Sequence, residues 1–166
     1  MKAFAKGSAG AGVENNESLT DALQQTLDEA RMVLPGIQAL FGFQLIAVFN
    51  EAFSQQLSEL EQRLHLVAIV FVTLAIALVM TPAAYHRQVD PQRATTTFLA
   101  LASRFVSAAM LPLAAGLALD VHLVARIITG SELTGGAIGG AVFAALIGLW
   151  FGFPQWHARQ RRRGAR

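Results

Sequence analysis

The chain has 166 residues, of which 54% are hydrophobic and only 14% are charged, whereas a soluble domain carries about 25% charged residues. The small net charge of +2 does not indicate nucleic-acid binding. The absence of cysteine excludes a disulfide framework, a thiolate metal site and a cysteine nucleophile.

Four segments contain no charged residue, and they lie at 32–49, 66–85, 105–119 and 133–156. An apolar stretch of about 18 or more residues is typical of a membrane span, because a helix rises about 1.5 Å per residue and the hydrocarbon layer is about 30 Å thick. The sequence therefore predicts an all-α polytopic membrane protein, a bundle of four transmembrane helices. The expected spans are approximately 32–50, 64–84, 98–121 and 134–156, within a membrane domain over 32–156.

The residues before the first span are expected to form two parts. Residues 1–17 are rich in Gly, Ala, Ser and Asn, a composition that predicts disorder. Residues 18–31 carry leucines at four-residue spacing after Ser18, a good helix N-cap. They predict a short amphipathic helix on the cytoplasmic surface, or an extension of the first span.

The first span is the most polar of the four. Its amides and its acid are Gln38, Gln44, Asn50 and Glu51. Buried amides need hydrogen-bond partners, so we expect these side chains to face the bundle interior. They would either join helices or line a path for an ion, with Gln44 and Glu51 on one helix face.

A second polar group is expected near the outer side of the membrane, where Glu51, His65, Asp120 and His122 all fall. Such a cluster could take up a proton or a cation, or its members could simply meet lipid headgroups. Asp120 and His122 are two residues apart and point away from each other on a helix, which argues against a metal site there.

The inner ends of the second and third spans carry further polar residues. Tyr85, His86 and Arg87 close the second span, as an interface anchor or as a pH-sensitive cluster with Arg104. Arg104 lies within the third span. It can extend its charged end to the headgroups, pair with Asp28, Glu29 or Asp90, or contact a substrate.

The fourth span contains a regular series of small residues, Gly136, Gly140, Ala144, Gly148 and Gly152. Small residues let two helices approach closely in lipid. The ridge predicts either packing against the first or third span, or a homo-oligomer interface. Residues 157–166 form a basic tail, which anchors the topology or binds anionic lipid.

Lys and Arg are concentrated before the first span, between the second and third, and after the fourth. Because positively charged loops stay in the cytoplasm, both termini and the loop at 85–97 are expected inside. The loops at 51–64 and 121–133 are expected outside.

Three segments carry a resemblance to a known group of proteins: "DEARMVLPGIQALFGFQL", "MTPAAYHRQ" and "RFVSAAMLPLAAGLALDVHLV". Over roughly residues 25–125 the chain resembles a family of small, uncharacterised four-span bacterial membrane proteins, some automatically labelled sodium:proton antiporter. The resemblance implies location in the bacterial inner membrane and four helices. Such antiporters are usually larger and combine paired mid-membrane acids with broken helices, a pattern that this sequence lacks.

No Gly-rich phosphate loop, nucleophile elbow or HExxH motif occurs, so we do not expect an enzyme, a metal site or a cofactor. The expected surroundings are the lipid bilayer, further copies of the chain and, under the alternative given below, a partner membrane protein. The leading hypothesis is an oligomeric channel or transporter for a proton or monovalent cation. The alternative is a non-catalytic accessory protein that docks onto other membrane proteins.

Overall fold

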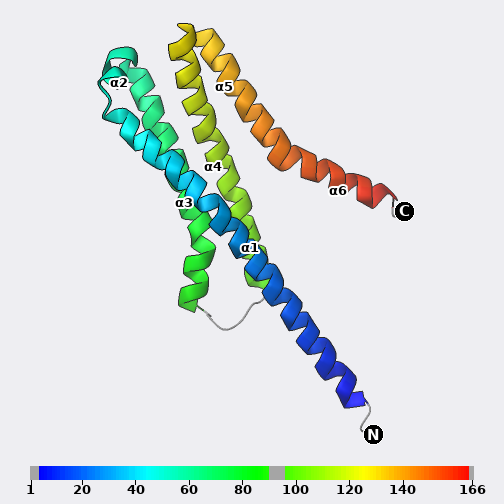
Figure 1. The fold of residues 1–166 in the computed structure, drawn as a ribbon. Coiled ribbons are helices and arrows are strands. Elements are labelled where there is room, and N and C mark those ends of the chain that lie inside the picture. Colours follow the sequence, from blue (N-terminus) through cyan, green and yellow to red (C-terminus); the bar gives the residue numbers. More distant parts are fainter. Residues whose placement is uncertain (1–3, 90–95, 165–166) are drawn as a thin grey trace.

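The computed structural model describes residues 4–89 and 96–164, and within these residues it contains only helices and the turns that join them (Figure 1). In chain order the elements are α1 (Phe4–Val48), α2 (Glu51–Gln56), α3 (Glu59–Val89), α4 (Thr96–Thr129), α5 (Glu132–Ile147), the π-helical turn η1 (Gly148–Gly152) and α6 (Phe153–Gly164). The predicted all-α class is confirmed for this part of the chain.

Within the described residues, four helices are long and apolar enough to cross a membrane, over Gln24–Val48, Glu59–Gln88, Thr96–Thr129 and Glu132–Arg161. A helix satisfies its backbone hydrogen bonds within one segment, so it is the form that lets a single apolar stretch enter hydrocarbon. The prediction of four such helices from the charge-free segments is therefore confirmed.

The first helix, α1, is continuous from Phe4 to Val48, and Pro35 lies inside it. The expected boundaries at residues 17 and 31 do not appear as breaks, so residues 18–31 belong to the same helix as the first candidate span, which begins at Gln24. Residues 4–17, for which disorder is expected, belong to the same helix, while residues 1–3 lie outside the described part. The physical reason is cooperativity, because extending an existing helix needs no new nucleus.

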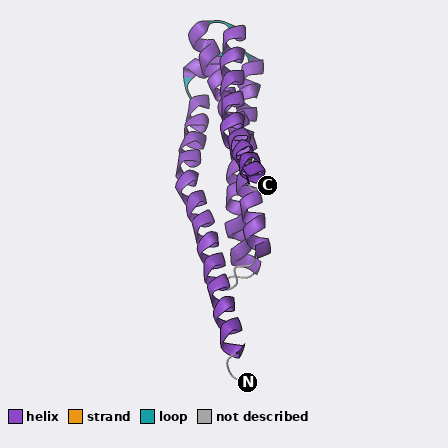
Figure 2. Cartoon of the chain, turned by 90° about the vertical axis from the view of Figure 1, so that its right-hand side faces the viewer, coloured by secondary structure: helices purple, strands orange, loops and turns teal. Residues whose placement is uncertain are grey.

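Helices α3 and α4 lie side by side and form the centre of the bundle (Figures 1 and 2). Their shared face is lined by small side chains, and a Cβ at Gly116 would lie only 2.9 Å from Val72 Cγ2. Where lipid surrounds the helices, such close approach strengthens dispersion contacts between them. Buried alanines extend this face along both helices: Ala68, Ala75, Ala102, Ala109 and Ala114.

Helix α1 crosses the α3–α4 pair (Figure 1). Ile37 anchors it, packing into a buried cluster with Val72, Ala75, Val79 and Ala109. Helix α2 and the α4–α5 turn lie together at one end of the bundle, which we call the α2 end. The last turn of α3 and the first turn of α4 lie at the opposite end, and α6 leads away from the bundle.

Helix α5 packs on α4 through Gly135 and Gly139. A Cβ at Gly139 would lie 2.7 Å from His122 Cβ, and one at Gly135 would lie 2.8 Å from Arg126 Cβ. The predicted ridge faces elsewhere: a Cβ at Gly136, Gly140, Gly148 or Gly152 would meet nothing within 4 Å, and Ala144 is exposed. Packing within the chain thus uses the neighbouring glycine series, a correction to the intramolecular interpretation of the ridge.

Candidate functional site

Three helices each contribute one polar side chain to a buried cluster at the α2 end. Gln44 Nε2 on α1 donates a hydrogen bond of 2.7 Å to Asp120 Oδ2 on α4. His65 Nδ1 on α3 lies 3.4 Å from Asp120 Oδ1, and His65 Nε2 lies 3.0 Å from the carbonyl oxygen of Gln44. Only 3% of Gln44 and 7% of His65 is exposed. We call these three residues the Asp120 cluster.

Ordinary helical spacing brings the cluster together. Gln44 lies about two turns after the buried Ile37 on α1, and Asp120 lies about one turn after the buried Gly116 on α4. His65 precedes Ala68 on the buried face of α3. The faces that pack the helices therefore also carry the polar side chains into contact.

The surroundings of His65 determine where its hydrogens lie. A backbone carbonyl oxygen can only accept, so His65 Nε2 donates to Gln44. In a neutral imidazole the other nitrogen then carries a bare lone pair, which would face the Asp120 carboxylate at 3.4 Å. A proton on Nδ1 or on the carboxyl group turns this repulsion into attraction. The geometry of the cluster therefore fits a state in which one proton lies between His65 and Asp120.

Two buried acceptors in the cluster have no hydrogen-bond partner among the described residues, namely Gln44 Oε1 and Asp120 Oδ1. The His65–Asp120 separation is within ion-pair range but longer than a well-formed N–H···O bond. Phe53 packs edge-on against His65, with ring centroids 5.2 Å apart. Because an unpaired buried acceptor costs about 1–3 kcal/mol, the site favours a ligand that donates a proton or carries positive charge.

A cavity of about 350 Å³ lies beside the Asp120 cluster, between α1, α2, the start of α3 and the last turns of α4. All three cluster residues line it, and most of the remaining lining is apolar. The apolar and aromatic residues of the lining are Leu40, Phe43, Ala47, Ala52, Phe53, Leu57, Leu123, Val124 and Ile127. The arrangement is an open, mostly apolar pocket that contains two ionisable side chains, His65 and Asp120.

A second polar network, centred on Arg126, ties the elements together at the α2 end. Arg126 Nε lies 2.7 Å from Glu61 Oε1 and 3.0 Å from Glu132 Oε1, and Arg126 Nη1 donates to the Gln56 carbonyl oxygen at 2.9 Å. Glu61 is 3% exposed. Arg126 thus joins α4 to α3, α5 and the end of α2.

Glu61 is held in place by the start of its own helix. Ser58 donates to Glu61 Oε2 from its backbone nitrogen at 2.8 Å and from Oγ at 2.6 Å, and Glu61 N lies 3.4 Å from Ser58 Oγ. This reciprocal pattern is a capping box. This network is not among the features expected from the sequence, although the Ser-x-x-Glu spacing at 58–61 is a signal for the capping box.

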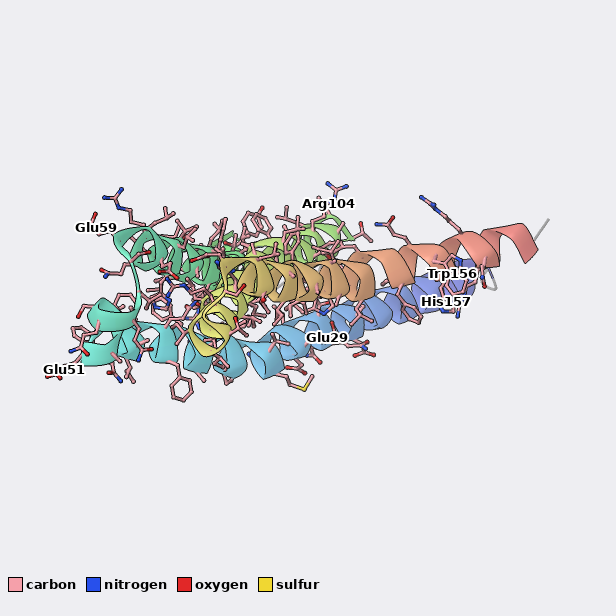
Figure 3. All side chains as sticks on the ribbon, turned by 90° about the horizontal axis from the view of Figure 1, so that it is seen from above. Glu29, Glu51, Glu59, Arg104, Trp156 and His157 are labelled. Carbon is pink, nitrogen blue, oxygen red and sulfur yellow. The ribbon has the colours of Figure 1, made fainter. Side chains whose placement is uncertain are left out.

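The predicted polar residues of the first span separate in the structure. Gln44 joins the Asp120 cluster, whereas Gln38 is exposed. Asn50 caps α2 by accepting a hydrogen bond from Ala52 N at 3.0 Å. Glu51 is exposed at the α2 end (Figure 3). Because α1 ends at Val48, the expected shared helix face of Gln44 and Glu51 does not form.

Arg104 is exposed on α4 and points away from the other helices, while Glu29 lies on the opposite side of the bundle (Figure 3). Asp28 lies 3.5 Å from Arg31 on its own helix. The structure therefore does not bring Arg104 to either of these predicted partners, and Asp90 lies outside the described residues.

At the end of α3 opposite the α2 end, Tyr85 stacks on Phe98 with ring centroids 5.8 Å apart, and the His86 ring centroid lies 5.3 Å from that of Phe98. Arg87 is exposed. These contacts pack the end of α3 against the start of α4. His122 faces α5 at Gly139 rather than the Asp120 cluster, as its spacing from Asp120 predicts.

Comparison with known proteins identifies one family. A family model matches residues 14–154, and it describes a family of unknown function (DUF6328). No curated protein and no solved structure matches the chain. The matched range includes the Asp120 cluster, its cavity and the Arg126 network.

Proposed function

Because the chain belongs to DUF6328, a family whose function is unknown, we propose a role that is argued from the residues of the chain itself. The protein is a membrane protein that binds and transfers a proton or monovalent cation at the Asp120 cluster. The observation that carries this proposal is the buried contact of Gln44, His65 and Asp120 across three helices that are apolar enough to span a membrane.

Two physical arguments support the proposal. Ionisable residues inside membrane-spanning helices are costly and typically mark ion or proton pathways. The bare lone pair of His65 opposite a carboxylate also makes one bound proton integral to the cluster. Of the two acids that the sequence places near the outer side, Asp120 lies in this cluster and Glu51 is exposed.

The test is proton flux into sealed proteoliposomes that contain a pH indicator, driven by a potassium diffusion potential. We expect Asp120→Asn and His65→Gln to lower the flux at least about tenfold, which corresponds to about 1.4 kcal/mol of barrier. Glu51→Gln is the matched control, since Glu51 is exposed and outside the cluster, and it should retain wild-type flux. Wild-type flux equal to that of protein-free vesicles would contradict the proposal.

A second candidate function is that of an accessory protein that docks onto other membrane proteins, or onto further copies of itself, through α5. It is favoured by the open face at Gly136 and Gly140, where a Cβ would meet nothing within 4 Å. Gly136→Leu and Gly140→Leu should then release a co-purifying partner or dissociate an oligomer while the single chain stays folded. An unchanged assembly in mild detergent would count against this role.

A further inference from the structure

We propose that the cavity beside the Asp120 cluster binds a lipophilic amine, an organic cation with an aromatic or branched apolar body. The inference rests on the proposed role of Asp120 as the ionisable group of the site, and it adds a substrate class to that role. The ammonium group would face Asp120 and Gln44, and the apolar body would fill the cavity between α1, α2 and α4.

The size and lining of the cavity fit such a ligand. Its volume of about 350 Å³ lies within the range of roughly 300–1,000 Å³ found for small-molecule sites. Phe43 and Phe53 line it, and an aromatic ring attracts a cation placed over its face. Leu123 and Ile127 supply aliphatic walls.

The polar groups of the cavity select for positive charge. The two buried cluster atoms without a hydrogen-bond partner among the described residues, Gln44 Oε1 and Asp120 Oδ1, are both acceptors. A lipid tail would leave Gln44 Oε1 without a donor, and an anion would be repelled by the carboxylate. An ammonium group supplies donors and charge together.

Charge balance links this binding to the cluster proton. His65 and Asp120 are the ionisable side chains among the lining residues. When an ammonium group approaches Asp120, the proton held between His65 and Asp120 leaves to solvent, and the net charge of the site is unchanged. One cation thus replaces one proton.

The experiment compares four probes by isothermal titration calorimetry on the purified full chain in detergent: naphthylmethylamine, naphthylmethanol, naphthalene carboxylate and ethylamine. We expect the aromatic amine to bind at least about tenfold tighter than the alcohol of the same shape, and the carboxylate and ethylamine to bind weakly. Titration in buffers of different ionisation enthalpy should show proton release on amine binding. Equal affinity of amine and alcohol would overturn the inference and identify an apolar groove for lipid tails.

Variants localise the binding. Asp120→Asn should weaken the amine at least about tenfold and leave the alcohol unchanged. Val124→Trp should weaken both, because Val124 lines the cavity and is 55% exposed, so the larger ring can enter without disrupting the core. Ile128→Trp is its control, since Ile128 is exposed one residue beyond the lining residue Ile127. Unchanged amine affinity in Val124→Trp would contradict the assignment of the cavity.

The outcomes separate this inference from the proposed function. Amine binding without proton flux in proteoliposomes would remove the transport proposal and leave the amine site. Proton flux without selective amine binding would remove the amine site and leave transport.

Discussion

Gln44 and Gln38 have the same side chain on the same helix but different surroundings. Gln44 is buried and donates to Asp120 at 2.7 Å, whereas Gln38 is exposed. We expect Gln44→Leu to lower the free energy of unfolding by about 1–2 kcal/mol, because the acceptor Asp120 loses the hydrogen bond that Gln44 donates. Gln38→Leu, the matched control, should change it by less than about 0.5 kcal/mol.

These two variants are best compared by thermal unfolding in the same detergent. If both lower the stability equally, the hydrogen bond between α1 and α4 contributes no specific stabilisation.

The two arginines at the α2 end, Arg63 on α3 and Arg126 on α4, also differ in burial. Arg126 pairs with Glu61, which is 3% exposed, at 2.7 Å, whereas the side chains of Arg63 and Glu59, 3.8 Å apart, are 77% and 91% exposed. Arg126→Gln leaves a buried carboxylate without its cation and should cost about 3 kcal/mol. Arg63→Gln should cost less than about 0.5 kcal/mol.

Chemical denaturation monitored by helix circular dichroism measures both arginine variants. A cost for Arg63→Gln as large as that for Arg126→Gln would show that burial of Glu61 is not the cause.

At the scale of helices, the packing of α5 on α4 depends on which glycines face α4. A side chain at Gly139 would clash with His122 Cβ and the Ala118 carbonyl oxygen, while one at Gly140 meets nothing within 4 Å. We therefore expect Gly139→Val to destabilise the α4–α5 pair by about 1–3 kcal/mol and Gly140→Val to leave it unchanged. A cysteine pair engineered across α4 and α5 in this cysteine-free chain would report the contact by disulfide formation.

Equal cross-linking in the two glycine variants would place the α4 contact elsewhere on α5. The sequence could not decide this point, because "GGAIGG" contains two glycine series of identical four-residue spacing. Periodicity shows that a helix face carries small residues. Only the neighbouring helix determines which of two equivalent faces packs against it.

For the whole molecule, the absence of native cysteine allows the topology to be tested directly. Glu51 lies at the α2 end of the bundle, and Gln88 lies in the last turn of α3 at the other end. If α3 crosses the membrane as its length and composition allow, Glu51→Cys and Gln88→Cys should be labelled from opposite sides by an impermeant maleimide. The distribution of Lys and Arg predicts labelling of residue 51 from outside.

Labelling of both positions from one side would refute the four-span topology. The number of helices could be predicted from the sequence because three of the charge-free segments are long enough to cross hydrocarbon, and the segment at 105–119 is lengthened by the apolar residues that precede Arg104. The continuity of α1 could not, since composition does not show where a helix that has already formed will stop.

The Asp120 cluster could be predicted only in part. Gln44 and Asp120 are recognisable from sequence as polar residues in apolar segments, and His65 as a titratable group near the same end. Their contact depends on how α1, α3 and α4 are rotated about their own axes. That rotation follows from packing at Ile37, Val72 and Gly116, which no single helix encodes.

The π-helical turn at Gly148–Gly152 has a consequence for any helix that docks along α5. A π-turn accommodates about one extra residue, which rotates the following residues by roughly 100° relative to an unbroken α-helix. In an unbroken α-helix a series at four-residue spacing drifts by about 40° around the axis at each step, and the π-turn takes back about 100° of that drift. Gly152 therefore lies closer to the line through Gly136 and Gly140 than its sequence spacing alone would place it. A neighbouring helix that docks on Gly136 and Gly140 could therefore still meet a small residue at the far side of the turn.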